Sequence, residues 1–309
     1  MKIEVINLRK HFINAKAVDD ISFTFNSGEI IGFVGPNGAG KTTTMRMMAT
    51  LDEPTDGDVY FDNVSVVESP ERVRELMGYV PESLPGHREM TVHEYLDFFA
   101  RAYGVRGQQR HKIVEEIEEF TNLLGIREKF LNDLSKGMGQ RVCLARALVH
   151  DPKVLIMDEP ASGLDPRARV ELRELLKVLA SQGKAILISS HILTELAEIC
   201  TGTVIIERGK ILRAGSLQEI IKEEGSRHRA VIRPLENPEA LYKMMLEMPG
   251  IVSARMLGVE VQIEIEGDEA KGSEILTELV KRGVRLAEFR QRPHDLESVF
   301  MNVTKGDVQ

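Results

Sequence analysis

The sequence predicts an α/β fold built around a phosphate-binding loop, followed by a small α+β domain. Three observations predict it: a glycine-rich loop between an apolar run and a helical pattern, a second apolar run that ends in two acids, and an alternation of short strands and helices after residue 224. The 309 residues are enough for about two domains, each with a core of its own.

The phosphate loop lies between residues 29–34, an apolar run short enough for a buried strand, and residues 43–51, which have the spacing of a helix. It is a complete Walker A motif with a second threonine behind it: Gly35, Pro36, Asn37, Gly38, Ala39, Gly40, Lys41, Thr42 and Thr43. Its glycines let backbone N–H groups curl around phosphate oxygens, and the helix N-terminus adds the positive end of its dipole. Lys41 supplies a charge and Thr42 a hydroxyl for Mg²⁺, so the loop predicts binding of a nucleoside triphosphate.

The second apolar run, residues 154–157, ends in Asp158 and Glu159. Both acids are expected at the C-terminal end of a buried parallel strand, the edge where α/β sheets bind ligands. Asp158 can hold Mg²⁺ through water, while Glu159 can polarise an attacking water. This division of roles favours hydrolysis over transfer to a second substrate, whereas the phosphate loop alone also suits a kinase, a GTPase or a motor.

A second anion site is predicted before the acid pair. Ser135 stands where a helix N-cap is expected, and the backbone N–H of Gly137 follows it. Residues 134–141 read Leu-Ser-Lys-Gly-Met-Gly-Gln-Arg, and here the chain resembles the ATP-binding cassette (ABC) transporter ATPases, whose signature is Leu-Ser-Gly-Gly-Gln. The match is closest to an exporter branch similar to bacterial drug, sodium and haem-related exporters. Lys136 and Met138 depart from the common signature, so only Ser135 and Gly137 carry its role over.

The resemblance implies roles for three further residues. Asp165 lies in a D-loop, residues 162–165, and it also reads as a helix N-cap followed by proline. His191 follows an apolar run, residues 185–188, and resembles the switch histidine that contacts the γ-phosphate. Phe12 stands where these cassettes carry an aromatic side chain that stacks on adenine.

Glu82 is the most informative departure from the family pattern, because the Q-loop usually presents glutamine at this position. A carboxylate can still ligate Mg²⁺ through oxygen, so the expected metal ligands are Thr42, Glu82 and Asp158. The added negative charge beside the metal leads to the hypothesis that ATP binding weakens when Mg²⁺ is scarce.

The predicted nucleotide-binding domain covers residues 1–224, and the resemblance implies a P-loop NTPase fold of the ABC ATPase type, with a mixed sheet core and a helical subdomain at about 83–150. A helix is expected at 91–103, in the region that meets the membrane-spanning partner in this family, and the acidic run 115–119 is expected on a solvated helix face. The accessory domain, residues 225–309, is predicted as β-α-β-β-α-β, the order of a ferredoxin-like fold. We expect this domain to support dimer formation or to shield the nucleotide-binding domain, rather than to bind a regulatory ligand.

Composition narrows the partners and the compartment. The 40 Lys plus Arg against 48 Asp plus Glu give a net charge of -8, which argues against nucleic acid as a partner. Cys143 and Cys200 lack metal or redox spacing and are expected as packed thiols in a reducing compartment. No apolar run reaches the roughly 18 residues of a membrane span, so the chain is expected to be cytoplasmic.

The combined expectation is an ATP-hydrolysing subunit that uses ATP and Mg²⁺, dimerises with a second copy or a closely related cassette, and drives separate membrane-spanning permease subunits from the inner face of the cell membrane. Two cassettes in this family meet head to tail, so that Ser135 and Gly137 of one copy close over the ATP of the other. The alternative is a soluble ABC ATPase acting on a ribosome or another complex; a single Walker A motif and the lack of a long heptad tract favour transport. The transported substrate is expected to be chosen by the membrane subunits.

Overall fold

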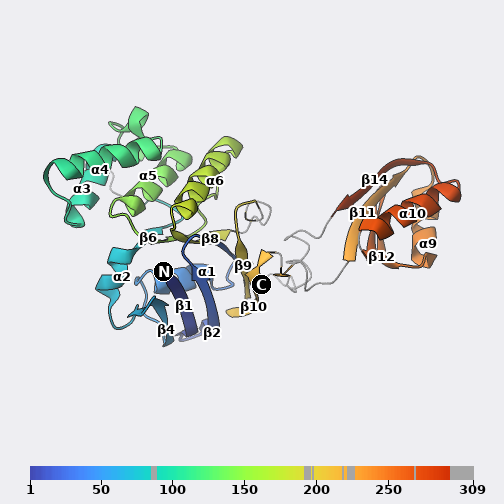
Figure 1. The fold of residues 1–309 in the computed structure, drawn as a ribbon, viewed down its shortest axis with the longest axis horizontal. Coiled ribbons are helices and arrows are strands. Elements are labelled where there is room, and N and C mark those ends of the chain that lie inside the picture. Colours follow the sequence, from blue (N-terminus) through green and yellow to red (C-terminus); the bar gives the residue numbers. More distant parts are fainter. Residues whose placement is uncertain are drawn as a thin grey trace. The chain divides into compact units, whose positions relative to one another are not determined.

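The computed structural model describes residues 1–84, 89–190, 196, 198–217, 219–220, 227–267 and 269–292. They form two compact units (Figure 1), of which the first includes Met1–Ser216 and the second begins at Leu217. The predicted boundary after residue 224 lies outside the described ranges and stays a prediction. Within those ranges, no helix has both the length and the apolar character needed to cross a membrane.

The first unit is built on a six-stranded sheet of order β10-β9-β3-β8-β7-β6. All pairings are parallel except that of β10 with β9. Every residue of β3, β7 and β8 is buried, which is why β3, β7 and the first four residues of β8 are continuous apolar runs in the sequence. The parallel register brings the carboxyl ends of these three strands to one edge of the sheet. The strands are β3 (Ile30–Val34), β6 (Met77–Val80), β7 (Val154–Met157), β8 (Ala185–Ser190), β9 (Gly202–Glu207) and β10 (Lys210–Ser216).

A second, antiparallel sheet of order β2-β1-β4-β5 covers the same core. Its strands are β1 (Lys2–Phe12), β2 (Ala15–Asn26), β4 (Asp56–Phe61) and β5 (Val64–Ser65). Met45, Met47 and Met48 of α1 (Lys41–Met48) are buried in this shared core. The phosphate loop and its helix are therefore held by both sheets. Among the described residues of this unit, α2 (Pro70–Leu76) and α6 (Pro166–Ser181) are helices outside the subdomain.

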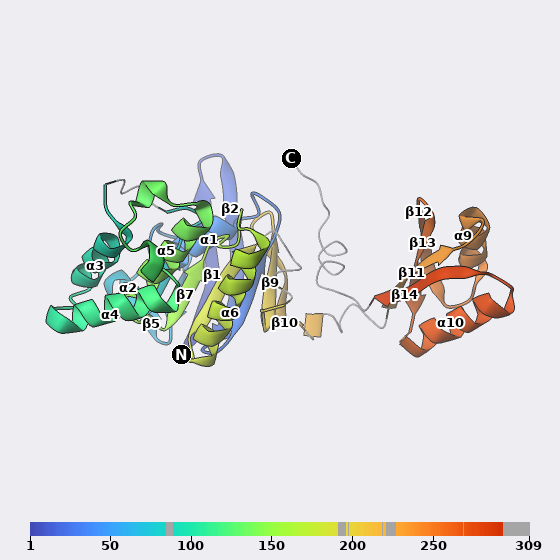
Figure 2. The same cartoon turned by 90° about the horizontal axis from the view of Figure 1, so that it is seen from above.

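Three helices lie together as a helical subdomain with a hydrophobic cluster of its own (Figure 1 and Figure 2). They are α3 (Val92–Ala102), α4 (Gly107–Phe120) and α5 (Lys136–Leu148), with short 3-10 turns at Leu124–Ile126 and Leu131–Asp133. The expected helix at 91–103 is present as α3, opened by a capping box between Thr91 and Glu94.

The expectation that the acidic run 115–119 is solvated was wrong for one residue. Glu118 is 0% exposed, and its carboxylate contacts His93 Nδ1 at 2.7 Å and Arg127 Nη2 at 3.4 Å. A helix turns about 100° per residue, so one member of an acidic run can face the core while its neighbours face water. Partners distant in the sequence make that burial tolerable.

The second unit confirms the predicted ferredoxin-like order. Its sheet runs β12-β13-β11-β14 with antiparallel neighbours, so the first strand lies between the third and the fourth. Apolar residues of the sheet and the two helices form a separate core. The elements are β11 (Arg227–Pro234), α9 (Pro238–Glu247), β12 (Ile251–Leu257), β13 (Glu260–Glu266), α10 (Glu269–Lys281) and β14 (Leu286–Arg292).

Candidate functional site

The phosphate loop joins the end of β3 to the start of α1, as the sequence predicts. Gly40 is the N-cap of α1 and has φ 106°, a backbone conformation that residues other than glycine rarely adopt. A Cβ at Gly40 would also collide with the backbone oxygen of Ala17 in β2. The loop therefore lies directly against β2, and its shape depends on glycine at this position.

A cavity of 520 Å³ opens over the loop. It gathers the loop, the end of β7 and the segment after β6, which are far apart in the sequence. Its lining residues are Ala17, Asn37, Gly38, Ala39, Gly40, Lys41, Thr42, Thr43, Glu82, Glu159 and Ser162. The structure thus brings most of the predicted nucleotide-binding residues to one cavity whose volume is typical of small-molecule sites.

Lys41 lies almost buried at the base of this cavity, with 7% of its side chain exposed. Its Nζ donates to the backbone oxygens of Gly35 at 2.8 Å and Pro36 at 3.2 Å, and it lies 3.9 Å from Glu159 Oε1. Burial lowers the pKa of the Lys41 ammonium, and the Glu159 and Asp158 carboxylates offset part of that effect. A buried ammonium among carbonyl groups is well placed to bind an anion.

Asp158 and Glu159 follow β7 directly and are held by Ser189 at the end of β8. The Ser189 hydroxyl donates to Asp158 Oδ1 at 2.8 Å, and it accepts the backbone N–H of Glu159 at 2.8 Å. The backbone N–H of Asp158 donates to Val80 at 2.8 Å. Glu159 has φ 47°, an unusual value for a residue with a side chain. These contacts keep one oxygen of Asp158 fixed and turn Glu159 toward the cavity.

Sequence reasoning missed Ser189 as a site residue. It follows four buried apolar residues, Ala185–Ile188, and is itself fully buried. A hydroxyl at the carboxyl end of a buried apolar strand indicates a polar partner, because buried polar groups are nearly always hydrogen-bonded. The identity of that partner could not be read locally, because it depends on β8 lying beside β7 in parallel register.

Glu82 lies two residues after β6 and lines the cavity, so the structure places it where a metal ligand is expected. Gln140 of α5 donates from Nε2 to the backbone oxygen of Pro81 at 3.4 Å. The segment that carries Glu82 is therefore tied to the helical subdomain. Thr42 and Asp158, the other two predicted metal ligands, lie at or beside the same cavity, and oxygen donors of this kind suit Mg²⁺.

Ser135, Gly137 and Asp165 do not line the cavity of their own chain. Ser135 is the N-cap of α5, where its hydroxyl accepts the backbone N–H of Met138 at 3.3 Å. Asp165 is the N-cap of α6 and accepts the backbone N–H of Ala168 at 2.9 Å. Both predicted caps are present. The anion site predicted at Ser135 and Gly137 is thus not part of this cavity within one chain and stays a prediction.

Phe12 is the last residue of β1 and 55% exposed, with Lys10 Nζ 5.4 Å from its ring centre. It does not line the cavity, although Ala17 from the same β1–β2 hairpin does. His191 lies outside the described residues, so its predicted contact with phosphate stays a prediction.

A groove of 410 Å³ lies between the β6 side of the sheet and the helical subdomain. Tyr103 stacks on His150 there, with ring centres 3.8 Å apart, and the guanidinium of Arg146 lies over Phe99 at 5.4 Å. Two further arginines, Arg46 and Arg74, line the same groove. The groove is thus aromatic and positively charged.

Comparison with known proteins gives a consistent result. Residues 18–162 match the family described as ABC transporter. The chain is 38% identical to the ABC transporter ATP-binding protein NatA of Bacillus subtilis, over 68% of this chain and 86% of that protein. It is 32% identical to the Nod factor export ATP-binding protein I of Burkholderia lata, over 99% of this chain and 98% of the relative.

Solved structures agree with these relatives. A dimeric ATP-binding cassette in a post-hydrolysis state, bound to ADP and Pi, superposes with a TM-score of 0.64 at 25% identity. The match covers 70% of this chain and 98% of the cassette.

Proposed function

Because the chain belongs to the ABC transporter family, in which it is an ATP-binding subunit, we propose that it hydrolyses ATP as one half of a dimer and drives export through separate membrane-spanning subunits. The observation that carries this proposal is the cavity in which Lys41 of the phosphate loop lies 3.9 Å from Glu159 at the end of β7. The cavity thus places a phosphate-binding cation beside a carboxylate that can serve as a base.

The loop supplies the phosphate end of the site. Gly38 has no atom within 4 Å of the place that a Cβ would fill, so the loop backbone is open to an incoming phosphate. The free N–H groups at the start of α1 and the Lys41 ammonium attract the negative charge. Thr42, Glu82 and Asp158 would hold Mg²⁺, which supplies charge neutralisation at the phosphate oxygens when bound.

Glu159 is the proposed general base. Its carboxylate lines the cavity, and its backbone is fixed by Ser189, so it can accept a proton from a water positioned in line with the terminal phosphate. Removal of a general base costs about 10² to 10⁴ in rate. We therefore expect Glu159→Gln to bind ATP, hydrolyse it at least about 100-fold more slowly, and accumulate as a dimer in size-exclusion chromatography with light scattering. Near-normal turnover would contradict this assignment.

A composite site would account for the finding that Ser135 and Gly137 do not line the cavity of their own chain. The Ser135 hydroxyl accepts one N–H within its helix, and its own hydrogen can still donate to a phosphate of a second copy. We expect Lys41→Ala and Gly137→Asp to be inactive as separate preparations. Mixed in equal amounts they would form dimers with one intact site and recover part of the activity. Failure to recover any activity, with dimers present, would argue against a shared site.

The membrane-spanning partner is proposed to dock in the groove beside α3 and α5. Arg74 and Arg146 give the groove a positive charge, whereas Arg46 is paired with Asp52 at 2.7 Å. A short cytoplasmic helix with acidic and apolar residues therefore fits the groove. Docking there would hold the chain at the inner face of the membrane. None of the described helices could itself cross a membrane. The relatives named for Nod factor export support the outward direction.

The test of docking uses the detergent-solubilised complex with its membrane subunits. Arg74→Glu is expected to lower the yield of co-purified membrane protein while ATP binding stays unchanged. Arg72→Glu is the matched control, because Arg72 is exposed on the same helix and does not line the groove. Equal yields with both variants would contradict the proposed surface, and persistent association with ribosomes would contradict transport.

A further inference from the structure

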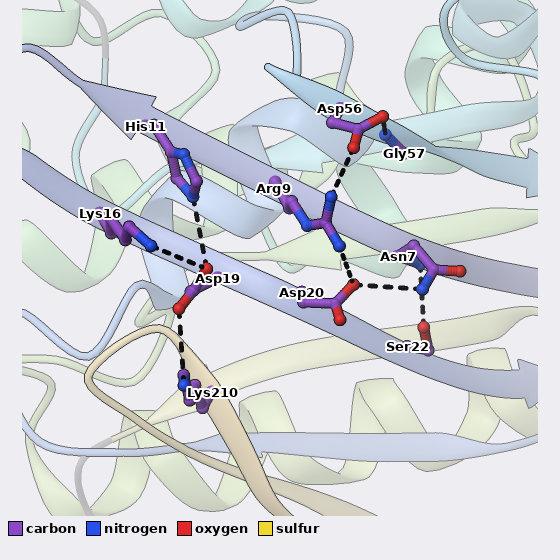
Figure 3. A network of polar contacts seen from close by, with 10 residues as sticks. All are labelled: Asn7, Arg9, His11, Lys16, Asp19, Asp20, Ser22, Asp56, Gly57 and Lys210. Carbon is purple, nitrogen blue, oxygen red and sulfur yellow. Dashed lines mark hydrogen bonds and ion pairs between the residues drawn. The ribbon is translucent and has the colours of Figure 1, made fainter.

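The carboxylate of Asp19 contacts both arms of the hairpin that carries Phe12. The β1 arm is also bonded to the segment before β4, where Lys10 Nζ donates to the oxygen of Glu53 at 2.6 Å and the His11 N–H donates to Thr55 Oγ1 at 3.0 Å. Asp19 Oδ1 lies 3.4 Å from His11 Nε2 and 3.7 Å from Lys16 Nζ (Figure 3). His11 and Lys16 face each other across the β1–β2 pair, one register step before Phe12 and Ala15 close it. Asp19 therefore contacts both arms of the hairpin just below its tip.

The same carboxylate reaches a third element. Asp19 Oδ2 lies 3.5 Å from Lys210 Nζ at the start of β10 (Figure 3). The backbone N–H of Asp19 also donates to the backbone oxygen of Gly209 at 2.8 Å. Gly209 has φ 76°, and a Cβ there would lie 2.9 Å from the oxygen of Ala17, so the β9–β10 turn approaches β2 as only glycine allows. The hairpin is thus fixed to this turn by both backbone and side chain.

The turn is in contact with the phosphate loop as well. The backbone N–H of Gly209 donates to the oxygen of Ala39 at 2.9 Å. One continuous path of contacts therefore runs from the hairpin tip through Asp19 and Gly209 to the loop. These elements are far apart in the sequence, and the path joins the two ends of the candidate nucleotide site.

The charges around Asp19 keep it ionised. Burial opposes ionisation, but Lys16, Lys210 and His11 outweigh that effect and hold the pKa of Asp19 below its ordinary value. Lys16 and Lys210 are each about two-thirds exposed, so either ion pair alone is weak. The restraint that Asp19 adds comes from one carboxylate shared by two lysines and a histidine on three different strands.

We propose that Asp19 is a positioning residue for the base end of the nucleotide site: it holds the Phe12 hairpin at a fixed place relative to the phosphate loop, so that a purine ring can stack while its phosphates are bound. This inference rests on the proposed function, because it takes Phe12 as the stacking surface. An anchored hairpin loses less conformational entropy when the ligand binds. Removal of the anchor is therefore expected to weaken the contact with the purine ring and to leave the binding of the phosphates unchanged.

Asp20 provides a matched control. It neighbours Asp19 on β2 and carries the same charge, but its carboxylate contacts Arg9 at 3.1 Å and Asn7 Nδ2 at 3.1 Å within the body of the sheet (Figure 3). Its φ of 65° is one that asparagine also tolerates. Asp19→Asn and Asp20→Asn therefore remove the same charge from adjacent positions with different partners.

The experiment compares affinities for Mg²⁺-ATP and for inorganic tripolyphosphate by titration calorimetry on the full chain. Asp19→Asn is expected to weaken ATP binding about threefold to fivefold and to leave tripolyphosphate binding within about twofold, whereas Asp20→Asn changes neither. In hydrolysis assays the KM for ATP rises by the same factor and kcat stays constant. Lys210→Met, which leaves β1 and β2 untouched, is expected to act in the same direction by a smaller factor.

A double-mutant cycle with Phe12→Ala separates positioning from general destabilisation. Once the aromatic ring is removed, Asp19→Asn is expected to have no further effect on ATP affinity. Equal effects of Asp19→Asn and Asp20→Asn, parallel loss of ATP and tripolyphosphate, or an undiminished effect in the Phe12→Ala background would each overturn the inference. If the unaltered chain bound neither ligand, the proposed function itself would be wrong, a result distinct from all three.

Discussion

The sharpest prediction concerns Ser189, because one fully buried hydroxyl holds both acids of the site. Ser189→Ala removes the bond to Asp158 Oδ1 and the bond from the Glu159 N–H, each 2.8 Å long. A hydrogen bond to a charged group contributes about 1.5 to 3 kcal/mol and a neutral one about 1 kcal/mol. We expect a loss of about 2 to 4 kcal/mol, which corresponds to a fall of about 30-fold or more in kcat if it is felt fully in the transition state.

The assay is steady-state ATP hydrolysis together with ATP affinity, with Thr203→Val as the control. Thr203 is buried in the same sheet and donates one hydrogen bond, to the oxygen of Gly32 at 2.8 Å, but it contacts neither acid. We expect Ser189→Ala to lower kcat with ATP affinity nearly unchanged, and Thr203→Val to lower only the urea midpoint of unfolding. If both variants lowered kcat by the same factor, Ser189 would act through stability alone and the reasoning would be refuted.

Three other predictions test charge and burial. Glu82→Gln is expected to bind ATP better than the unaltered chain at low Mg²⁺ and equally well at saturating Mg²⁺; unchanged Mg²⁺ dependence in binding titrations would contradict the metal role. Burial raises the pKa of Cys143 to about 11 and that of Cys200 further, so the thiolate is scarce at pH 8, and a thiol-specific reagent should modify neither residue until urea is added. In thermal unfolding, Glu118→Ala is expected to lower the free energy of unfolding by about 1 to 3 kcal/mol. This is less than for an ion pair fully excluded from water, because His93 and Arg127 can reach water. Glu119→Ala, on the exposed face, is expected to change it by no more than about 0.5 kcal/mol in the same assay.

The contiguous parts of the site could be predicted from the sequence because their chemistry is local. The phosphate loop, the acids after β7 and the caps Ser135 and Asp165 each depend on a few neighbouring residues. Buried parallel strands also show as unbroken apolar runs, since both faces are covered. The order of the second domain followed from alternating strand and helix patterns for the same reason.

The parts that could not be predicted depend on pairing between distant segments. Ser189 reaches Asp158 only because β8 lies beside β7, and Glu118 is buried only because His93 and Arg127 approach it from other elements. The hydrogen bond between Asp19 and Gly209 joins residues near the two ends of the first unit's sequence. Local sequence patterns show which residue types are available for such contacts, but the pairing of distant strands and helices determines which residues meet.

The charge of the cavity bears on how a nucleotide is held. Two carboxylates, Glu82 and Glu159, line it with a single ammonium, Lys41, and Asp158 lies behind them. A triphosphate adds further negative charge, so the residues of one chain leave an excess that a metal ion and donors from outside the chain must balance. Ser135 and Gly137, at the start of α5 and outside the lining of this cavity, are donors of the required kind. The acid excess therefore supports the proposal that the site closes when a second copy contributes, and the release of inorganic phosphate after hydrolysis would then remove the bridging charge and favour its opening.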